Sequence, residues 1–380
     1  MSKQSISQYE QGKGTPSPEH AEKLAQLLRL PIRYFLESEA SEDPAPIYWR
    51  SMAAATKVAR ARARRRYDWI RRVVRYLSDY VEFPALNLPI ALSVTEPAVI
   101  SDQMIEDAAA ETRRHFGLGC GAIDNMTWLL ENNGIIIGFA ELEAATLDAF
   151  SQMCGDHRAF AIVNSEQGSA VRFRFDLAHE LGHMVLHRNL DPRFFSSPVR
   201  NSLMENQAHH FAAEFLMPST VFARNFRATT VEGLKLTKRA WKVSMQAALV
   251  HANRIGLVSE SQYQHMWRTL SARGYRRKEP LDEYFQPEQP VMLRSAFETL
   301  LSANPAMKDE LLVALPYHGN EIEQMCGLPS GTLVDHDAPA GVFDIGLSQR
   351  QRPPALHTRD SRPITKADIL EFPGSRGKPE

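Results

Sequence analysis

The segment HELGH at residues 179–183 sets the strongest limit on how this chain can fold. Apolar residues recur around it at helical spacing, and on a helix positions i and i+4 share one face, so the imidazoles of His179 and His183 can reach one ion. Zn²⁺ accepts neutral imidazole, and Glu180 would stand beside it as a base for a metal-activated water. The segment therefore predicts a helix that carries a metal site.

A catalytic zinc site needs a third protein ligand and one open position. A second helix is expected at residues 203–217. It contains four side chains able to bind a metal, namely Glu205, His209, His210 and Glu214. Glu205 and Glu214 lie two and a half turns apart, so both cannot bind the same ion. His187 follows His183 by one turn, and three histidines spaced by four cannot converge without bending the helix, which makes His187 a supporting or packing residue.

The composition is that of a soluble globular protein, with 43% hydrophobic and 23% charged residues. The N-terminus lacks the apolar core of a signal peptide, and no apolar stretch is long enough to span a bilayer. The three cysteines are widely spaced and form no C-x-x-C pair, which argues against a disulfide framework. We therefore expect a cytoplasmic protein with no membrane segment.

The formal net charge of −1 hides a segregated distribution. Residues 1–90 carry 15 Lys and Arg against 10 Asp and Glu, a net charge of +5, so the remainder of the chain is −6. Residues 51–82 are expected to form one long amphipathic helix with a dense basic face. Its arginines can cover apolar surface in solvent or contact phosphates with salt-dependent affinity. The run Arg64, Arg65 and Arg66 favours contact with nucleic acid or an acidic partner.

Residues 169–218 resemble the ImmA/IrrE family of zinc metallopeptidases. The resemblance rests on RFDLAHELGHMVLH at residues 174–187 and on ENQAHHFAAEFLMP at residues 205–218. It implies a zinc-dependent endopeptidase that acts as a regulator. Its protein substrate would be a DNA-binding repressor or antitoxin-like protein, whose cleavage relieves transcriptional repression under stress or in mobile elements.

The resemblance also assigns roles to single residues. It implies that His179 and His183 are metal ligands, that Glu180 is the general base, and that the third ligand is the glutamate opening the second helix, which is Glu205. The family usually has Asn where this chain has His209, so His209 would support a ligand or be a spare metal-binding group. The implied metal is Zn²⁺, although a site of two histidines and a glutamate can also take other divalent ions such as Mn²⁺.

Residues 1–36 resemble the second half of a Cro/C1-type (XRE-like) helix-turn-helix domain, chiefly through SISQYEQG at residues 5–12. The first helix of this chain would be the recognition helix, whose N-terminal residues meet base edges in the major groove. Lys3, Gln4 and Gln8 would then be the exposed DNA-contacting residues. The resemblance lacks the first two helices of such a domain, so we expect a remnant that positions this helix poorly, in a truncated member or a chain whose start lies upstream.

These observations together predict an α+β fold that is mostly helical, with buried strands expected near residues 134–140 and 159–163. Five segments are expected: a partial helix-turn-helix at residues 1–40, a linker and long basic helix at 41–92, a zincin-like ImmA/IrrE peptidase domain with a small sheet and a following helical segment at 93–275, a helical C-terminal region at 276–347, and a disordered tail at 348–380.

Two classes of function remain open on the sequence. The first is the regulatory zinc endopeptidase described above. The second is a DNA-binding transcriptional regulator in which the metal site is structural or sensory. The presence of Glu180 favours the first, since a structural metal site does not require a general base.

Overall fold

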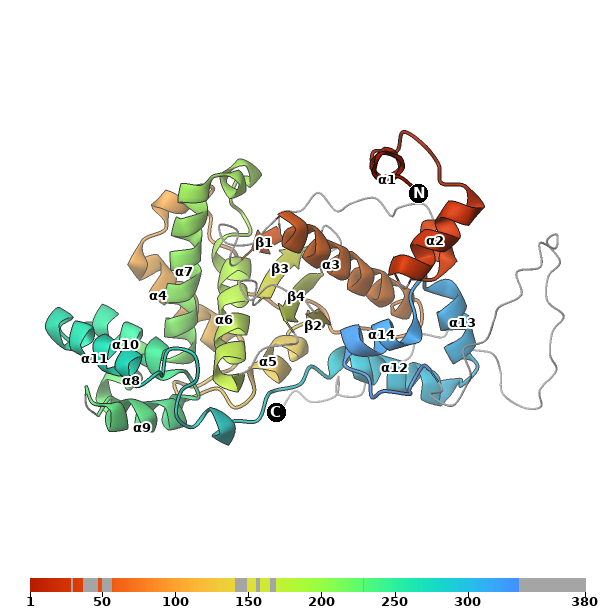
Figure 1. The fold of residues 1–380 in the computed structure, drawn as a ribbon. Coiled ribbons are helices and arrows are strands. Elements are labelled where there is room, and N and C mark those ends of the chain that lie inside the picture. The colour runs from red at the N-terminus through yellow and green to blue at the C-terminus, as the bar shows by residue number, and fades with distance from the viewer. Residues whose placement is uncertain are drawn as a thin grey trace. The chain divides into compact units, whose positions relative to one another are not determined.

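The computed structural model describes residues 1–28, 30–36, 47–49, 57–140, 149–154, 158–164, 169–227 and 229–334. The tail at residues 348–380 and most of the linker before the basic helix lie outside these residues. Helices dominate the described part of the chain and its strands form one small sheet, so the mostly helical α+β class is confirmed (Figure 1). No helix in the described part is long and apolar enough to cross a bilayer.

The chain divides into two compact units. The smaller consists of Met1–Glu42, Ile70–Glu82 and Arg294–Glu380, and the larger consists of Asp43–Trp69 and Phe83–Leu293. The larger unit contains the sheet and the HELGH segment.

The sheet has four strands in the order β1-β3-β4-β2. Their bounds are Ile47–Trp49 for β1, Ile135–Ala140 for β2, Ala149–Met153 for β3 and Ala159–Asn164 for β4. Strand β3 is antiparallel to β1 and β4, and β2 is parallel to β4. The two apolar runs predicted as strands are β2 and β4. Sequence reasoning missed β3, because the polar residues at its centre, although buried, interrupt the apolar run.

Two helices lie against opposite faces of the sheet, and the first of them belongs to the larger unit only as far as Trp69. Helix α3 (Lys57–Leu77) places Tyr67 against Phe160 of β4, with the ring centroids 5.5 Å apart. On β3, Ser151 is paired with the residue after Phe160 and therefore points to the other face. There its hydroxyl donates a hydrogen bond to Glu180 of helix α6 (Ala170–Leu186), which contains the HELGH segment. Figure 1 shows α6 beside the sheet.

Helix α7 (Pro198–Leu216) packs along α6, and the two cross at Gly182. A Cβ placed on Gly182 would lie 3.0 Å from Cδ1 of Phe211 and 3.2 Å from the carbonyl oxygen of Ala208, both on α7. A residue with a side chain would fit here only if Phe211 or the α7 backbone moved by a few tenths of an ångström. Helix α7 begins five residues before the predicted start, with a proline in its first turn, a position that tolerates the missing N–H.

Further helices surround this pair in the larger unit. Their bounds are Asp102–His115 for α4, Met126–Asn132 for α5, Ser219–Asn225 for α8, Val231–Trp241 for α9, Met245–Arg254 for α10 and Glu260–Ala272 for α11. Helix α4 packs on α7, α5 packs on β2, and α10 contacts both α7 and α9. The helical segment expected after the metal-binding helices is α9 to α11.

The smaller unit joins the two ends of the described chain. Its helices include α1 (Lys3–Glu10), α2 (Pro18–Leu28), α13 (Met307–Ala314), α14 (Gly319–Cys326) and most of α12 (Met292–Ala303). The guanidinium of Arg33 donates to the carbonyl oxygen of Val313 over 3.2 Å. The segment after α2 is therefore held against the C-terminal helices.

Replacing Gly182 by alanine should destabilise the larger unit. Overpacking costs about 1–3 kcal/mol, whereas the better helix propensity of alanine returns up to about 1 kcal/mol, so we expect a net loss of about 1–2 kcal/mol. All five tryptophans belong to the larger unit, so tryptophan fluorescence during urea unfolding follows that unit alone. The matched control is Gly119→Ala, where a Cβ would meet nothing within 4 Å. Equal stability of the two variants would contradict the close crossing.

Candidate metal centre

Three side chains from α6 and α7 converge in the larger unit. The Nε2 atoms of His179 and His183 are 3.1 Å apart. Glu205 places one carboxylate oxygen 3.3 Å from Nε2 of His179 and the other 3.3 Å from Nε2 of His183. Both imidazoles are buried, while the Glu205 side chain is 21% exposed. The group is therefore open to solvent on the side of Glu205.

The spacing of these atoms can be compared with what an ion requires. Zn²⁺ binds imidazole nitrogen at about 2.0–2.1 Å and carboxylate oxygen at about 2.0–2.2 Å, so neighbouring ligands in a tetrahedral site lie about 3.3 Å apart. The two nitrogens are 3.1 Å apart, and each lies 3.3 Å from a different oxygen of the Glu205 carboxylate, so all three separations are close to that value. Two neutral nitrogens and one carboxylate are also donors that zinc and related transition ions accept. The residues therefore fit a divalent ion.

Glu180 lies on α6 between the two histidines and is fully buried. Its Oε2 accepts a hydrogen bond of 2.5 Å from the hydroxyl of Ser151 on β3. The sheet thus fixes the carboxylate from the face opposite α3. Sequence reasoning did not identify Ser151, because its strand was not predicted; a polar residue within an otherwise apolar segment was the available signal.

A chain of hydrogen bonds leads from the protein backbone to His183. The side-chain nitrogen Nε2 of Gln207 donates hydrogen bonds to the backbone carbonyl oxygens of Pro97, at 2.8 Å, and Ile100, at 3.2 Å. The side-chain oxygen Oε1 of Gln207 is therefore free to accept a hydrogen bond from Nε2 of His187, which lies 3.1 Å away. Nδ1 of His187 then lies 2.9 Å from Nδ1 of His183.

These contacts determine which ring nitrogen of His183 carries the proton. Burial, followed by the charge of a protonated His183, holds the pKa of His187 well below its usual range, so its ring is neutral and has one N–H. Because that N–H points at Gln207, Nδ1 of His187 accepts, and Nδ1 of His183 must donate. In the neutral form of His183, Nε2 is then the unprotonated nitrogen, and it faces His179 and Glu205. His187 is therefore a supporting residue, as its position one turn beyond His183 predicted.

The other candidates on α7 lie outside this group. Nδ1 of His209 donates to the backbone oxygen of Glu205 over 2.7 Å, and its ring packs edge-on against His179 with centroids 4.4 Å apart. His209 therefore packs beside a ligand position. His210 and Glu214 are directed to other partners, on α4 and at the start of α8.

The predicted DNA-contacting residues of α1 lie on an exposed helix. Ser2 caps this helix by accepting a hydrogen bond from the backbone nitrogen of Ser5 over 3.1 Å. Lys3, Gln4 and Gln8 are all exposed. No residue of α1 is buried, so α1 is supported weakly and its polar side chains face solvent.

The predicted arginines of α3 differ in their surroundings. Nε of Arg64 lies 3.3 Å from a carboxylate oxygen of Asp68, and the guanidinium of Arg66 stacks over Trp69, 4.8 Å from the ring centroid. Both side chains are half-buried, whereas Arg65 is exposed. Local contacts thus account for part of the basic face, and Arg65 is the exposed residue among these three.

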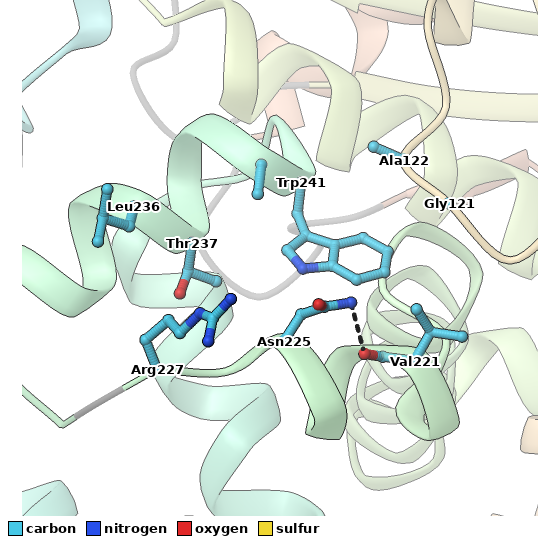
Figure 2. Close-up of a pocket in the computed structure, with 9 residues that line it drawn as sticks. Gly121, Ala122, Val221, Asn225, Arg227, Leu236, Thr237 and Trp241 are labelled. Atoms are coloured by element: carbon cyan, nitrogen blue, oxygen red, sulfur yellow. Dashed lines mark hydrogen bonds between the residues drawn. The ribbon is translucent and has the colours of Figure 1, made fainter.

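A separate pocket of about 420 Å³ lies between α8, α9 and the loop before α5 (Figure 2). The indole of Trp241 forms one wall, and Asn225 and Arg227 stand at its edge. The pocket shares no residue with the histidine–glutamate group. It does not contain the metal centre.

Two segments of the chain match known families. Residues 130–253 match the IrrE N-terminal-like domain of the M78 peptidases, and residues 1–35 match a helix-turn-helix family. The first segment contains α6, α7 and the strands β2, β3 and β4, and therefore all three side chains of the group. No curated protein matches the chain. The resemblance inferred from the sequence is confirmed for both segments.

Replacing Gln207 by leucine should weaken Zn²⁺ binding about 10- to 100-fold, because the residue that orients His187 and, through it, His183 is lost. Gln207→Glu keeps an oxygen acceptor for His187 but loses the donor to the carbonyl oxygens of Pro97 and Ile100, so its affinity should lie between those of the unchanged chain and the leucine variant. Competition with a chromogenic chelator measures both variants, and the exposed neighbour Asn206→Leu is the control. Equal losses in the leucine and glutamate variants would show that Gln207 acts only through packing.

Proposed function

We propose that this chain, which carries an IrrE N-terminal-like peptidase domain and a helix-turn-helix segment, is a zinc-dependent endopeptidase that regulates transcription. Its substrate would be a DNA-binding repressor or antitoxin-like protein in the cytoplasm, whose cleavage relieves repression under stress. The main support is the group formed by His179, His183 and Glu205, with the buried carboxylate of Glu180 beside it. Zn²⁺ suits this donor set best, and Mn²⁺ is a second divalent ion it accepts.

The chain's own residues would divide the work of hydrolysis. His179, His183 and Glu205 would hold the ion, which when bound supplies a Lewis acid that acidifies water and polarises the scissile carbonyl. Glu180 would take a proton from the attacking water and deliver it to the nitrogen of the leaving amine. Ser151 would keep the Glu180 carboxylate in one orientation through its bond to Oε2.

The burial of Glu180 favours catalysis over a structural or sensory metal site. Burying a carboxylate costs several kcal/mol unless other groups compensate. A site that only holds a metal obtains nothing from a second carboxylate, in addition to Glu205, next to its ligands. Glu180 is nevertheless fully buried and has a dedicated hydroxyl partner. A general base requires this arrangement, because it must lie within reach of the reacting water.

The replacement Glu180→Gln should leave the metal bound and reduce cleavage by a factor of about 10²–10⁴, since the amide cannot accept the proton. The assay incubates the chain with purified repressors encoded near its gene, with and without a chelator, and detects fragments by mass spectrometry. Metal content is measured on the same samples. Cleavage by a metal-loaded Glu180→Gln variant at the normal rate would exclude the proposed mechanism.

We also propose that the basic face of α3 adds sequence-independent contact with DNA. Each phosphate contact changes the slope of log affinity against log salt by about −0.9. Replacing Arg65 by glutamine should therefore make that slope less negative by up to about 1. Binding to all DNA sequences should weaken by the same factor. Lys3→Ala on α1 should instead change the preference between sequences. The proposal fails if no DNA is bound at low salt, or if the affinity is the same at low and high salt.

A further inference from the structure

A second group of metal-binding side chains lies where α4 packs on α7. Glu106 on α4 and His210 and Glu214 on α7 each place a ligand atom within 4.8 Å of the other two. None of these three residues belongs to the group that contains Glu205. The same helix, α7, therefore contributes to both groups.

His210 is the buried centre of this second group. Its side chain is 2% exposed, and neither ring nitrogen makes a hydrogen bond within the described residues. The nearest acceptors are Oδ1 of Asp102, 3.3 Å from Nδ1, and Oε1 of Glu106, 3.7 Å from Nε2. A buried polar group that lacks a hydrogen bond costs about 1–3 kcal/mol. The long contacts with these two carboxylates offset the burial of this ring only in part, and a further partner would stabilise it.

The protonation state of His210 makes a cation the natural partner. Burial, followed by the charge of Arg254, lowers the pKa of His210 to about 4, so the imidazole is neutral at pH 7 and has a lone pair to offer. Burial also raises the pKa of Glu214, while the hydrogen bonds from Ser219 and the charge of Arg254 act in the opposite direction. Glu106, Glu214 and Asp102 thus place three carboxylates around the imidazole, with the positive charge of Arg254 nearby.

The carboxylates of this second group differ in how firmly they are held and in how exposed they are to solvent. Glu214 accepts hydrogen bonds from the backbone nitrogen of Ser219, at 3.2 Å, and from its hydroxyl, which fixes the carboxylate at the start of α8. The side chains of Glu106 and Asp102 are 41% and 84% exposed, so the group opens to solvent on the side of α4. The neutral imidazole thus lies between a carboxylate fixed by Ser219 and a partly exposed carboxylate, Glu106, which leaves an entry path for an ion.

We propose that Glu106, His210 and Glu214 form a second divalent-cation site, with Asp102 at its rim. One imidazole nitrogen and carboxylate oxygens select a transition ion such as Zn²⁺ over Mg²⁺ or Ca²⁺, which prefer oxygen ligands alone. The ion would connect α4 to the C-terminal half of α7 and to the start of α8. It would thereby stabilise the helix that presents Glu205 to the first group.

The test uses the full chain with His179→Ala and His183→Ala, which remove the first group without touching the second. After treatment with a chelator, this double variant is titrated with ZnCl₂ in a calorimeter and its bound metal is counted by mass spectrometry. We expect one equivalent to bind and the thermal midpoint to rise with Zn²⁺. Because the background lacks the peptidase ligands, the result does not depend on the proposed peptidase function.

Adding Glu106→Gln to this background should lower the affinity at least tenfold and abolish the thermal shift. Glu111→Gln is the matched control, because Glu111 lies on the same helix and pairs with Arg114 outside the group. His210→Gln, with its fold checked by circular dichroism, should have the same effect as Glu106→Gln. The proposal is overturned if the double variant binds no Zn²⁺, or if its binding is unchanged by Glu106→Gln and His210→Gln.

Discussion

The close crossing of α6 and α7 at Gly182 is the constraint on which the metal centre depends. A Cβ at this position would press against the backbone and side chains of α7 at 3.0–3.2 Å. Its absence lets α7 approach α6 closely enough for Glu205 to come within 3.3 Å of both histidine Nε2 atoms. A wider crossing would leave a pair of histidines without a third ligand. One glycine inside the HELGH segment thus serves packing and chemistry together.

Around that crossing, polar groups are buried in an apolar core and their contacts are mutually consistent. Ser151 fixes Glu180 from the sheet, and Gln207 fixes His187, which in turn sets the tautomer of His183. Such networks are costly when one member is missing and rigid when complete. The network draws on β3, α6, α7 and the segment before α4, so the site is held by most of the larger unit.

Sequence reasoning reached the parts of the site that follow from local spacing. The placement of His179 and His183 on one helix face follows from their separation of four residues. That Glu205, and not Glu214, meets them agrees with the resemblance stated from the motifs. Ser151 could not be foreseen, because its role arises from strand pairing between distant segments. The link through Gln207 depends in the same way on backbone carbonyls of a loop 110 residues earlier in the chain.

The arginines of the basic face of α3 show that sequence composition alone does not predict which contacts each side chain makes. The run of three arginines favoured contact with nucleic acid or an acidic partner over a solvated face, yet Arg64 pairs with Asp68 and Arg66 stacks on Trp69. Spacing along a helix shows that such contacts are possible but not which of them form. The exposure of Lys3, Gln4 and Gln8 was foreseen, because a short helix with few apolar residues cannot be buried on more than one side.

We expect one ion to bind where α6 and α7 meet. The most direct test is anomalous diffraction at the zinc absorption edge from crystals of the zinc-loaded chain. The account predicts a peak bound by Nε2 of His179, Nε2 of His183 and the carboxylate of Glu205 at about 2.0–2.2 Å. A peak that lacks Glu205 as a ligand, or no peak at this crossing, would contradict it.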